Sequence, residues 1–113
     1  MKIDKKRLQL LLKVLPEGED NAISLETLSR YFGVTERDIR SLILNARQNG
    51  YMICSLPSEQ KGYYLPANNF ELLRCYRMFR KRAESTASIL QGMKDYLLKN
   101  GIDPDRDKKG GRV

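Results

Sequence analysis

The side chains able to carry out covalent or metal chemistry are few in this sequence. The 113-residue chain contains no histidine, which excludes a Ser-His-Asp triad, a Cys–His pair and an imidazole metal ligand. Its two cysteines, Cys54 and Cys75, are too few for a four-thiolate zinc site, and we interpret both as small apolar residues. The Asp-rich run at residues 103–107 lacks the glycine of a calcium loop, because Lys108 occupies the sixth position. The sequence therefore predicts a protein that is not an enzyme and has no metal site and no cofactor.

Recognition through charge is the chemistry that the composition favours. Lysines and arginines number 21 against 14 acidic residues, for a net charge of +7, and 41% of the residues are hydrophobic. Such a surplus in a folded chain indicates a polyanionic partner, most often nucleic acid. The surplus is uneven, since residues 1–67 hold 10 basic and 8 acidic side chains whereas residues 68–113 hold 11 and 6.

Three short helices are predicted in the first half of the chain. Leucines at helical spacing indicate the first of them between residues 4 and 16, and further apolar periods indicate helices over residues 24–32 and 35–49. The caps and turns that set these limits are Asp4, Pro16, Ser24, Gly33, the Thr35–Asp38 capping box and Gly50.

The apolar period changes from helix to strand after Gly50. Residues 51–56 are rich in β-forming side chains, residues 57–62 are typical of a turn, and residues 63–65 can return as a second strand. The expected fold is therefore mainly α with a small β-hairpin, in a first domain of residues 1–67.

The last predicted helix is capped by Asn68 or Asn69 and runs to about Asn100, with Gly101 as its stop. Its apolar residues alternate at spacings of four and three, which is the heptad pattern of a coiled coil. We expect residues 68–101 to pair with a second copy of the chain, forming a homodimer. The predicted dimerisation residues are Leu72, Tyr76, Phe79, Ala83, Leu90, Met93 and Leu97, with the polar Thr86 in one layer.

Alternatives to this plan stay open for the C-terminal part. Residues 85–88 contain few strong helix formers and Gly92 weakens the helix, so a helical hairpin is the competing structure. Residues 102–113 are charged and glycine-rich, which is typical of a disordered tail. No segment reaches the roughly 20 apolar residues that span a bilayer, and no secretory signal is recognisable, so we expect a cytoplasmic protein without membrane contact.

One run of residues gives a specific resemblance. Bacterial and phage winged-helix regulators of the biotin-repressor and deoxyribonucleoside-repressor type are similar over residues 23–40, where this chain has ISLETLSRYFGVTERDIR. Asn49-Gly50-Tyr51 and the run KGYYL at residues 61–65 resemble the helix end and second wing strand of these families. The resemblance covers roughly residues 4–66. It implies a winged helix-turn-helix that binds double-stranded DNA as a transcriptional regulator.

The resemblance also implies which side chains would meet the DNA. It places the start of the third helix in the major groove, where Arg37 and Arg40 would pair with guanine and Asn45 with adenine. Leu44, Arg47 and Gln48 are further residues that face away from the core. The other predicted DNA-binding residues are Glu36 toward cytosine, Thr35 and Ser41 near base edges, Ser24 and Thr35 at helix N-termini suited to phosphate, and Lys61 at the wing tip.

Other partners are also compatible with the sequence. The acidic start of the third helix and the modest charge of residues 1–67 would suit a protein-binding module in a replication or phage complex. The densest basic cluster, at residues 74–82, would flank DNA, contact RNA or an acidic protein, or remain a solvated helix face. No region resembles a ligand-binding domain, so no small-molecule partner is expected.

Overall fold

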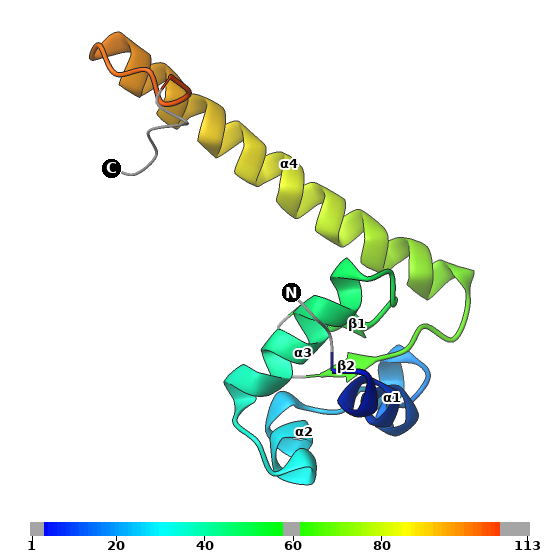
Figure 1. The fold of residues 1–113 in the computed structure, drawn as a ribbon. Helices are drawn as coiled ribbons and strands as arrows, with labels where there is room; N and C mark the ends of the chain where they lie inside the picture. Colours follow the sequence, from blue (N-terminus) through cyan, green and yellow to red (C-terminus); the bar gives the residue numbers. More distant parts are fainter. Residues whose placement is uncertain (1–3, 58–61, 107–113) are drawn as a thin grey trace. The chain divides into compact units, whose positions relative to one another are not determined.

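The computed structural model describes residues 4–57 and 62–106 of the chain. The described residues form a mainly helical fold with a two-stranded antiparallel hairpin and a long last helix (Figure 1), which confirms the predicted fold class at this level. The chain divides into two compact units, Met1–Tyr76 and Arg77–Val113, and the first of them extends beyond the predicted boundary at residue 67. The elements are α1 (Lys5–Val14), η1 (Glu19–Asn21), α2 (Leu25–Phe32), α3 (Glu36–Gln48), β1 (Cys54–Ser55), β2 (Tyr63–Tyr64) and α4 (Asn69–Lys99).

Each of the first three helices begins at its predicted cap. The side chains of Asp4 and Ser24 accept hydrogen bonds from the backbone N–H three residues later, at 3.2 and 3.1 Å. Thr35 and Asp38 form the complete capping box, with bonds of 3.1 and 3.2 Å in the two directions. Gly33 and Gly50 adopt φ of 68° and 91°, the left-handed backbone that lets the chain turn sharply after α2 and α3.

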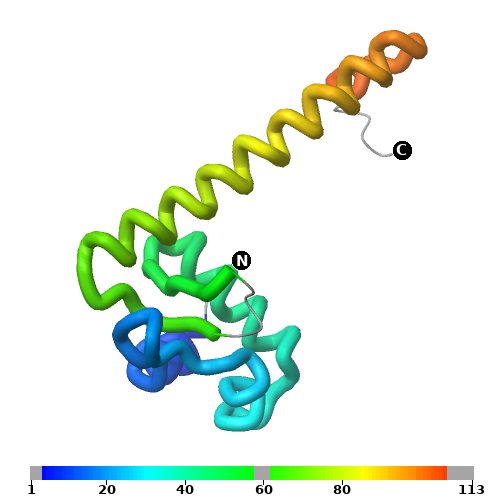
Figure 2. The backbone as a smooth tube through the Cα atoms, turned by 180° about the vertical axis from the view of Figure 1, so that it is seen from behind, coloured from blue at the N-terminus to red at the C-terminus, as the bar shows by residue number. Residues whose placement is uncertain are grey.

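An apolar core joins the three short helices to the hairpin, and Figure 2 shows the backbone of these elements lying close together, seen from behind. The inner face of α3 is buried as predicted, and it packs against both α1 and α2. Because these side chains fix α3 from one side, the opposite face of the helix is turned to solvent. The buried members of the core are Leu8, Leu11, Leu15, Leu25, Leu28, Ile39, Leu42, Ile43, Ala46, Ile53 and Tyr63.

The hairpin is shorter than predicted. β1 pairs with β2 through Cys54 opposite Tyr64 and Ser55 opposite Tyr63. The expected first strand over residues 51–56 was wrong at its start, because the Tyr51 N–H closes the end of α3 on the Ala46 carbonyl at 3.0 Å. The other edge of β2 is covered, since Ile23 and Tyr63 exchange two backbone hydrogen bonds of 2.9 Å. Most of the predicted turn between the strands lies outside the described residues.

Gly62 is a position where only glycine fits. A Cβ atom there would lie 2.6 Å from the Cβ of Ala22 and 3.3 Å from the Leu56 side chain. We expect Gly62→Ala to lower the free energy of unfolding of the first unit by about 1–3 kcal/mol, because the hairpin must move away from Ala22. Urea denaturation measures this. The matched control is Gly92→Ala in α4, where nothing lies within 4 Å. An equal loss of stability in both variants would contradict the steric explanation.

The last helix is one continuous element. The side chain of Asn68 accepts the Glu71 N–H at 2.9 Å, so Asn68 is the cap, and α4 then runs unbroken through residues 85–88 to Lys99. This excludes the helical hairpin that the sequence left open. Gly101 ends the helix with φ of 78°. Residues 102–106, assigned to the tail from sequence, form a turn, and the Lys94 ammonium pairs with the Asp105 carboxylate at 2.9 Å.

Two buried cysteines join α4 to the hairpin within the first unit. The Cys75 thiol shares a hydrogen bond with Cys54, and this bond, together with burial, raises the pKa of Cys54 well above its ordinary 9.0. Burial likewise raises the pKa of Tyr64 to about 12 from 10.0. Both groups therefore remain protonated in the folded unit at a pH where the unfolded chain would already lose the proton.

The raised pKa values of Cys54 and Tyr64 make the stability of the first unit sensitive to alkali. Stability should be complete below about pH 9 and fall as the pH rises toward 12, because the unfolded chain releases these protons first. Tyr64 alone accounts for about 2 kcal/mol by pH 12. Denaturation at pH 8, 10 and 11.5, compared with Tyr64→Phe, checks the prediction. A decline above pH 10 that is equally steep in Tyr64→Phe would show that Tyr64 does not contribute.

Candidate nucleic-acid interface

The solvent-facing side of α3, here called the outer face, is the candidate interface. Arg37, Arg40 and Ser41 lie on it at helical spacing and are exposed, and none of the three has a hydrogen bond or ion pair to another described side chain. Leu44 continues the same face with 54% of its surface exposed, followed by Gln48. The structure thus brings three of the predicted DNA-binding residues together on one accessible surface.

The start of α3 uses its polar residues to cap the helix. The Thr35 hydroxyl accepts the Asp38 N–H, and the Asp38 carboxylate accepts the Thr35 N–H. Asp38 therefore contributes negative charge that the helix N-terminus already offsets. Glu36 is exposed and points its charge to the same end of the helix.

A hollow of about 280 Å³ separates the first turns of α2 and α3. Ser24, Leu25, Glu26 and Glu36 line it. The Ser24 hydroxyl accepts the Thr27 N–H and donates to the Thr27 hydroxyl at 2.8 Å, so its own side chain is already occupied. Arg30 offsets Glu26 through an ion pair of 3.2 Å, whereas Glu36 would repel a phosphate placed here. The structure brings Ser24 and Glu36 together, but their surroundings do not favour an anion.

Arg47 is a correction to the sequence interpretation, which placed it on the side of α3 away from the core. Its Nε donates to the Ile53 carbonyl at 2.8 Å and its Nη2 to the Ser55 hydroxyl at 3.3 Å. The guanidinium also lies over the Tyr63 ring, 5.8 Å from its centroid. Arg47 therefore holds α3 against the hairpin. Asn45 is half-buried, and Lys61 lies outside the described residues.

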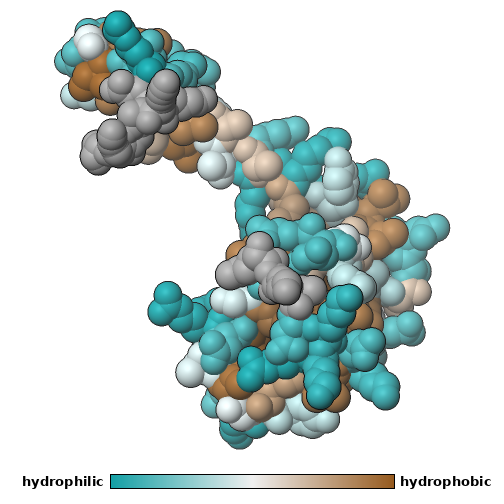
Figure 3. All heavy atoms as spheres, in the orientation of Figure 1, coloured by the Kyte–Doolittle hydropathy of each residue, from teal (hydrophilic) through white to brown (hydrophobic). Residues whose placement is uncertain are grey.

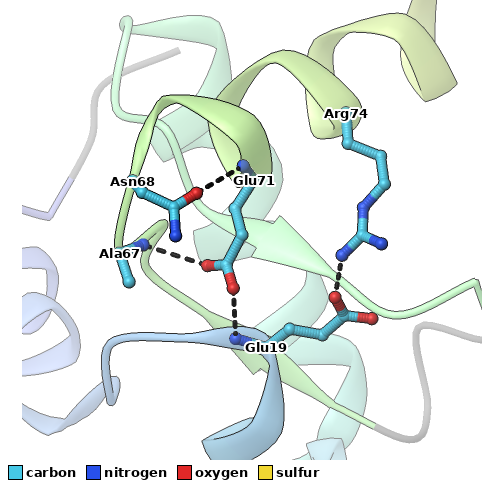
Figure 4. Close-up of polar contacts among 5 residues, drawn as sticks. All are labelled: Glu19, Ala67, Asn68, Glu71 and Arg74. Carbon is cyan, nitrogen blue, oxygen red and sulfur yellow. Dashed lines mark hydrogen bonds and ion pairs between the residues drawn. The ribbon is translucent and has the colours of Figure 1, made fainter.

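A polar cluster fastens the start of α4 to the first unit (Figure 4). The Glu71 carboxylate accepts the Ala67 N–H at 3.0 Å and the Glu19 N–H at 3.2 Å, and Arg74 forms an ion pair with the Glu19 carboxylate. Arg74 is thus committed to holding α4. Sequence reasoning missed this cluster, since no local pattern links residues so far apart in the chain.

The rest of the predicted basic cluster belongs to the second unit. Arg80 pairs with Glu84 at 3.7 Å, and Arg82 lies over the Phe79 ring at 5.0 Å from its centroid. Arg77 and Lys81 are exposed. The cluster is therefore less available to a polyanion than its density in the sequence suggests.

Comparisons with protein-family models, with curated proteins and with solved structures find no match to this chain. No group of three or more potential metal-ligating side chains occurs among residues 4–57 and 62–106. None of the helices in those ranges is both long and apolar enough to cross a bilayer.

Proposed function

We propose that this chain binds double-stranded DNA through the outer face of α3, as a dimeric transcriptional regulator of the winged-helix type. The observation that carries the proposal is the pair Arg37 and Arg40, one helical turn apart and exposed, on a helix whose other face is fixed in the core. The major groove of B-DNA, about 12 Å wide, admits an α-helix, and arginine pairs in two-pronged fashion with guanine. The hairpin β1–β2 would be the wing.

The support of α3 suits a reading helix. The capping box caps its first turn, and its inner face packs in the core. Arg47 links its last turn to the hairpin through hydrogen bonds. Side chains that recognise bases must be held within a fraction of an ångström of their binding positions. This requires a helix that is fixed rigidly to the rest of its domain. These three supports act on both ends and one side of α3.

The charge of the first domain explains why two copies would be needed. Residues 1–67 carry a surplus of only two positive charges, and Glu36 lies near the reading end. Affinity for DNA depends strongly on phosphates neutralised by lysine and arginine, so a single copy would bind weakly. Two copies on one duplex double both the charge and the base contacts.

A shift assay with the full chain and a pool of random duplexes tests the proposal. Binding at about 50 mM salt should weaken by about 100-fold at about 200 mM, as expected for roughly four phosphate contacts. Sequencing of the bound duplexes would then give the preferred site. Absence of any shift at the lower salt concentration, with the protein folded, would refute DNA binding.

A protein-binding module in a replication or phage complex is the second candidate. Leu44 favours it, because this leucine is 54% exposed on a face that also begins with Glu36. A protein interface would depend most on a central apolar side chain, whereas a DNA interface would depend most on the arginines. Loss of partner binding in Leu44→Ala, together with no DNA shift in the native chain, would favour this alternative.

A further inference from the structure

The second unit carries a mainly apolar stripe that we call the seam: Phe79, Ala83, Thr86, Leu90, Met93 and Leu97. Its two end residues are half-buried. Leu90 and Met93 expose 65% and 58% of their surfaces, and Ala83 and Thr86 are also exposed. Figure 3 shows hydrophobic atoms at the surface of this unit. A stripe of this kind along a helix indicates a surface that is covered by another helix.

The seam carries a hollow with the form of a helix-packing socket. The hollow has a volume of about 520 Å³, and α4 supplies most of its walls. Among the lining residues, 90, 93, 94 and 97 stand at the i, i+3, i+4, i+7 spacing of the four residues that receive one side chain from a facing helix. The remaining wall is the turn at Pro104 and Asp105, held by the ion pair from Lys94.

We propose that the α4 of a second copy occupies this seam in antiparallel orientation, centred on Ser88. The inference rests on the dimeric part of the proposed function and specifies its geometry. In this register Phe79 lies opposite Leu97 of the second copy, Ala83 opposite Met93, and Thr86 opposite Leu90. The two-fold axis repeats these three layers, so the whole seam is used.

Side-chain volume favours the antiparallel arrangement over the parallel one. A parallel pair would stack Ala83 on Ala83 and Thr86 on Thr86 in adjacent layers, and would stack Phe79 on Phe79 one turn earlier. The side chains would fill too little volume in the Ala83 and Thr86 layers and too much in the Phe79 layer for even packing along the interface. In the antiparallel register the small Ala83 and Thr86 each face a long side chain, Met93 or Leu90, so neighbouring layers have similar volumes.

The residues beside the seam also favour the antiparallel arrangement. In the antiparallel register Ile89 lies next to Ile89 of the second copy at the two-fold axis, and Tyr96 lies next to Arg82 of the second copy. Ile89 and Tyr96 expose 58% and 67% of their surfaces, so the pairing would cover two further apolar side chains. A parallel pair would instead place Ile89 beside the charge of Lys94.

Charges on the opposite flank do not oppose the pairing. Arg80 of one copy would approach Lys94 of the other. Each is already matched within its own chain, Arg80 by Glu84 at 3.7 Å and Lys94 by Asp105 at 2.9 Å. The Asp105 hydrogen bond also raises the pKa of Lys94, in keeping with a charge that has its own counterion.

The register also sets a distance. Tyr76 ends the first unit, and it would lie opposite Asn100 of the second copy. At 1.5 Å per residue the two copies of Tyr76 are then about 36 Å apart along the helix axis. The pairing thus fixes the distance between the two positions at which the chains leave their first units.

Cysteine cross-linking tests the orientation. Full-length Ala83→Cys and Met93→Cys, carrying tags of different size, are oxidised separately and as a mixture with copper phenanthroline. The antiparallel register predicts that a disulfide-linked dimer of mixed size forms in the mixture, whereas each variant alone stays largely uncross-linked. The native chain, whose Cys54 and Cys75 are buried, is the background control.

Every other outcome overturns the inference. Efficient cross-linking of each variant with itself would show a parallel dimer, in which case the proposed dimeric function stands and only the orientation fails. A monomeric mass for the native chain in sedimentation, with no cross-linking, would remove both the pairing and the dimeric part of the proposed function. DNA binding is measured separately on the uncross-linked native chain, so its failure is recognised independently.

Discussion

Replacing both Arg37 and Arg40 by alanine should lower the affinity for duplex DNA by about 100-fold. A well-placed pair of hydrogen bonds from arginine to guanine discriminates by about 1–3 kcal/mol, so two such contacts correspond to roughly 2–6 kcal/mol. A hundredfold change in the dissociation constant is about 2.7 kcal/mol, near the lower end of that range. Fluorescence anisotropy with the selected duplex, at one fixed salt concentration, gives the ratio directly.

The control for this variant removes the same charge elsewhere. Arg7 and Arg30 lie on α1 and α2 and are exposed, and among the described residues they pair with Asp4 and Glu26. Their double alanine variant should lose less than about 5-fold in affinity, since exposed ion pairs contribute little to stability and only the net charge changes. An equal loss in both double variants would mean that α3 does not read bases. Thermal unfolding should be nearly unchanged in Arg37→Ala plus Arg40→Ala, because neither side chain has a described partner to lose.

The local parts of the fold were predictable because their causes lie within a few residues. A Ser, Thr or Asp that accepts the N–H three residues later defines a helix start without help from the rest of the chain, as Ser24 and Thr35 show. Gly33 and Gly50 could be placed for the same reason, since a left-handed residue after an apolar helix face needs no tertiary contact to be recognised. The outward direction of Arg37 and Arg40 followed from the buried period of α3.

The parts that failed depend on contacts between distant residues. Tyr51 does not belong to the strand, because its backbone N–H bonds to the end of α3 instead. β propensity describes only how well a residue suits a strand and takes no account of this alternative bond. Arg47 has the spacing of an outward residue, and only the position of Ile53 and Ser55 turns it back onto the hairpin. The Glu71 carboxylate accepts the backbone N–H of Glu19, which lies 52 residues away in the chain, so this contact is not recognisable from the sequence.

The site itself divides in the same way. Helical period was sufficient to group Arg37, Arg40 and Ser41, and the structure keeps them on one face. The surroundings of Ser24, where Glu26 and Glu36 share a hollow, follow from how α2 and α3 pack and could not be foreseen. The winged-helix relationship and DNA binding stay predictions, which the binding assays decide.

Replacing Leu90 by glutamate should separate the dimer and weaken binding to a duplex with two half-sites by about 100-fold. Each of the two central layers would bury a carboxylate opposite Thr86 without a cation to pair with it, which costs more than the pairing gains. When the two reading units are no longer linked, the second binds without the effective concentration that linkage supplies, and that factor is typically 10²–10⁴. Sedimentation measures the mass, and anisotropy measures binding to duplexes with one or two half-sites.

The single half-site distinguishes loss of pairing from damage to the reading unit. Leu90 belongs to the second unit, so Leu90→Glu should leave binding to one half-site unchanged within about 2-fold and lose only the gain from the second. Ser88→Glu adds the same charge at the outermost heptad position of α4, away from the seam, and should remain a dimer with native affinity. If Ser88→Glu weakens two-site binding as much as Leu90→Glu does, the effect is repulsion between carboxylate and phosphate. If Leu90→Glu keeps the dimeric mass, the seam is not the contact between the two copies.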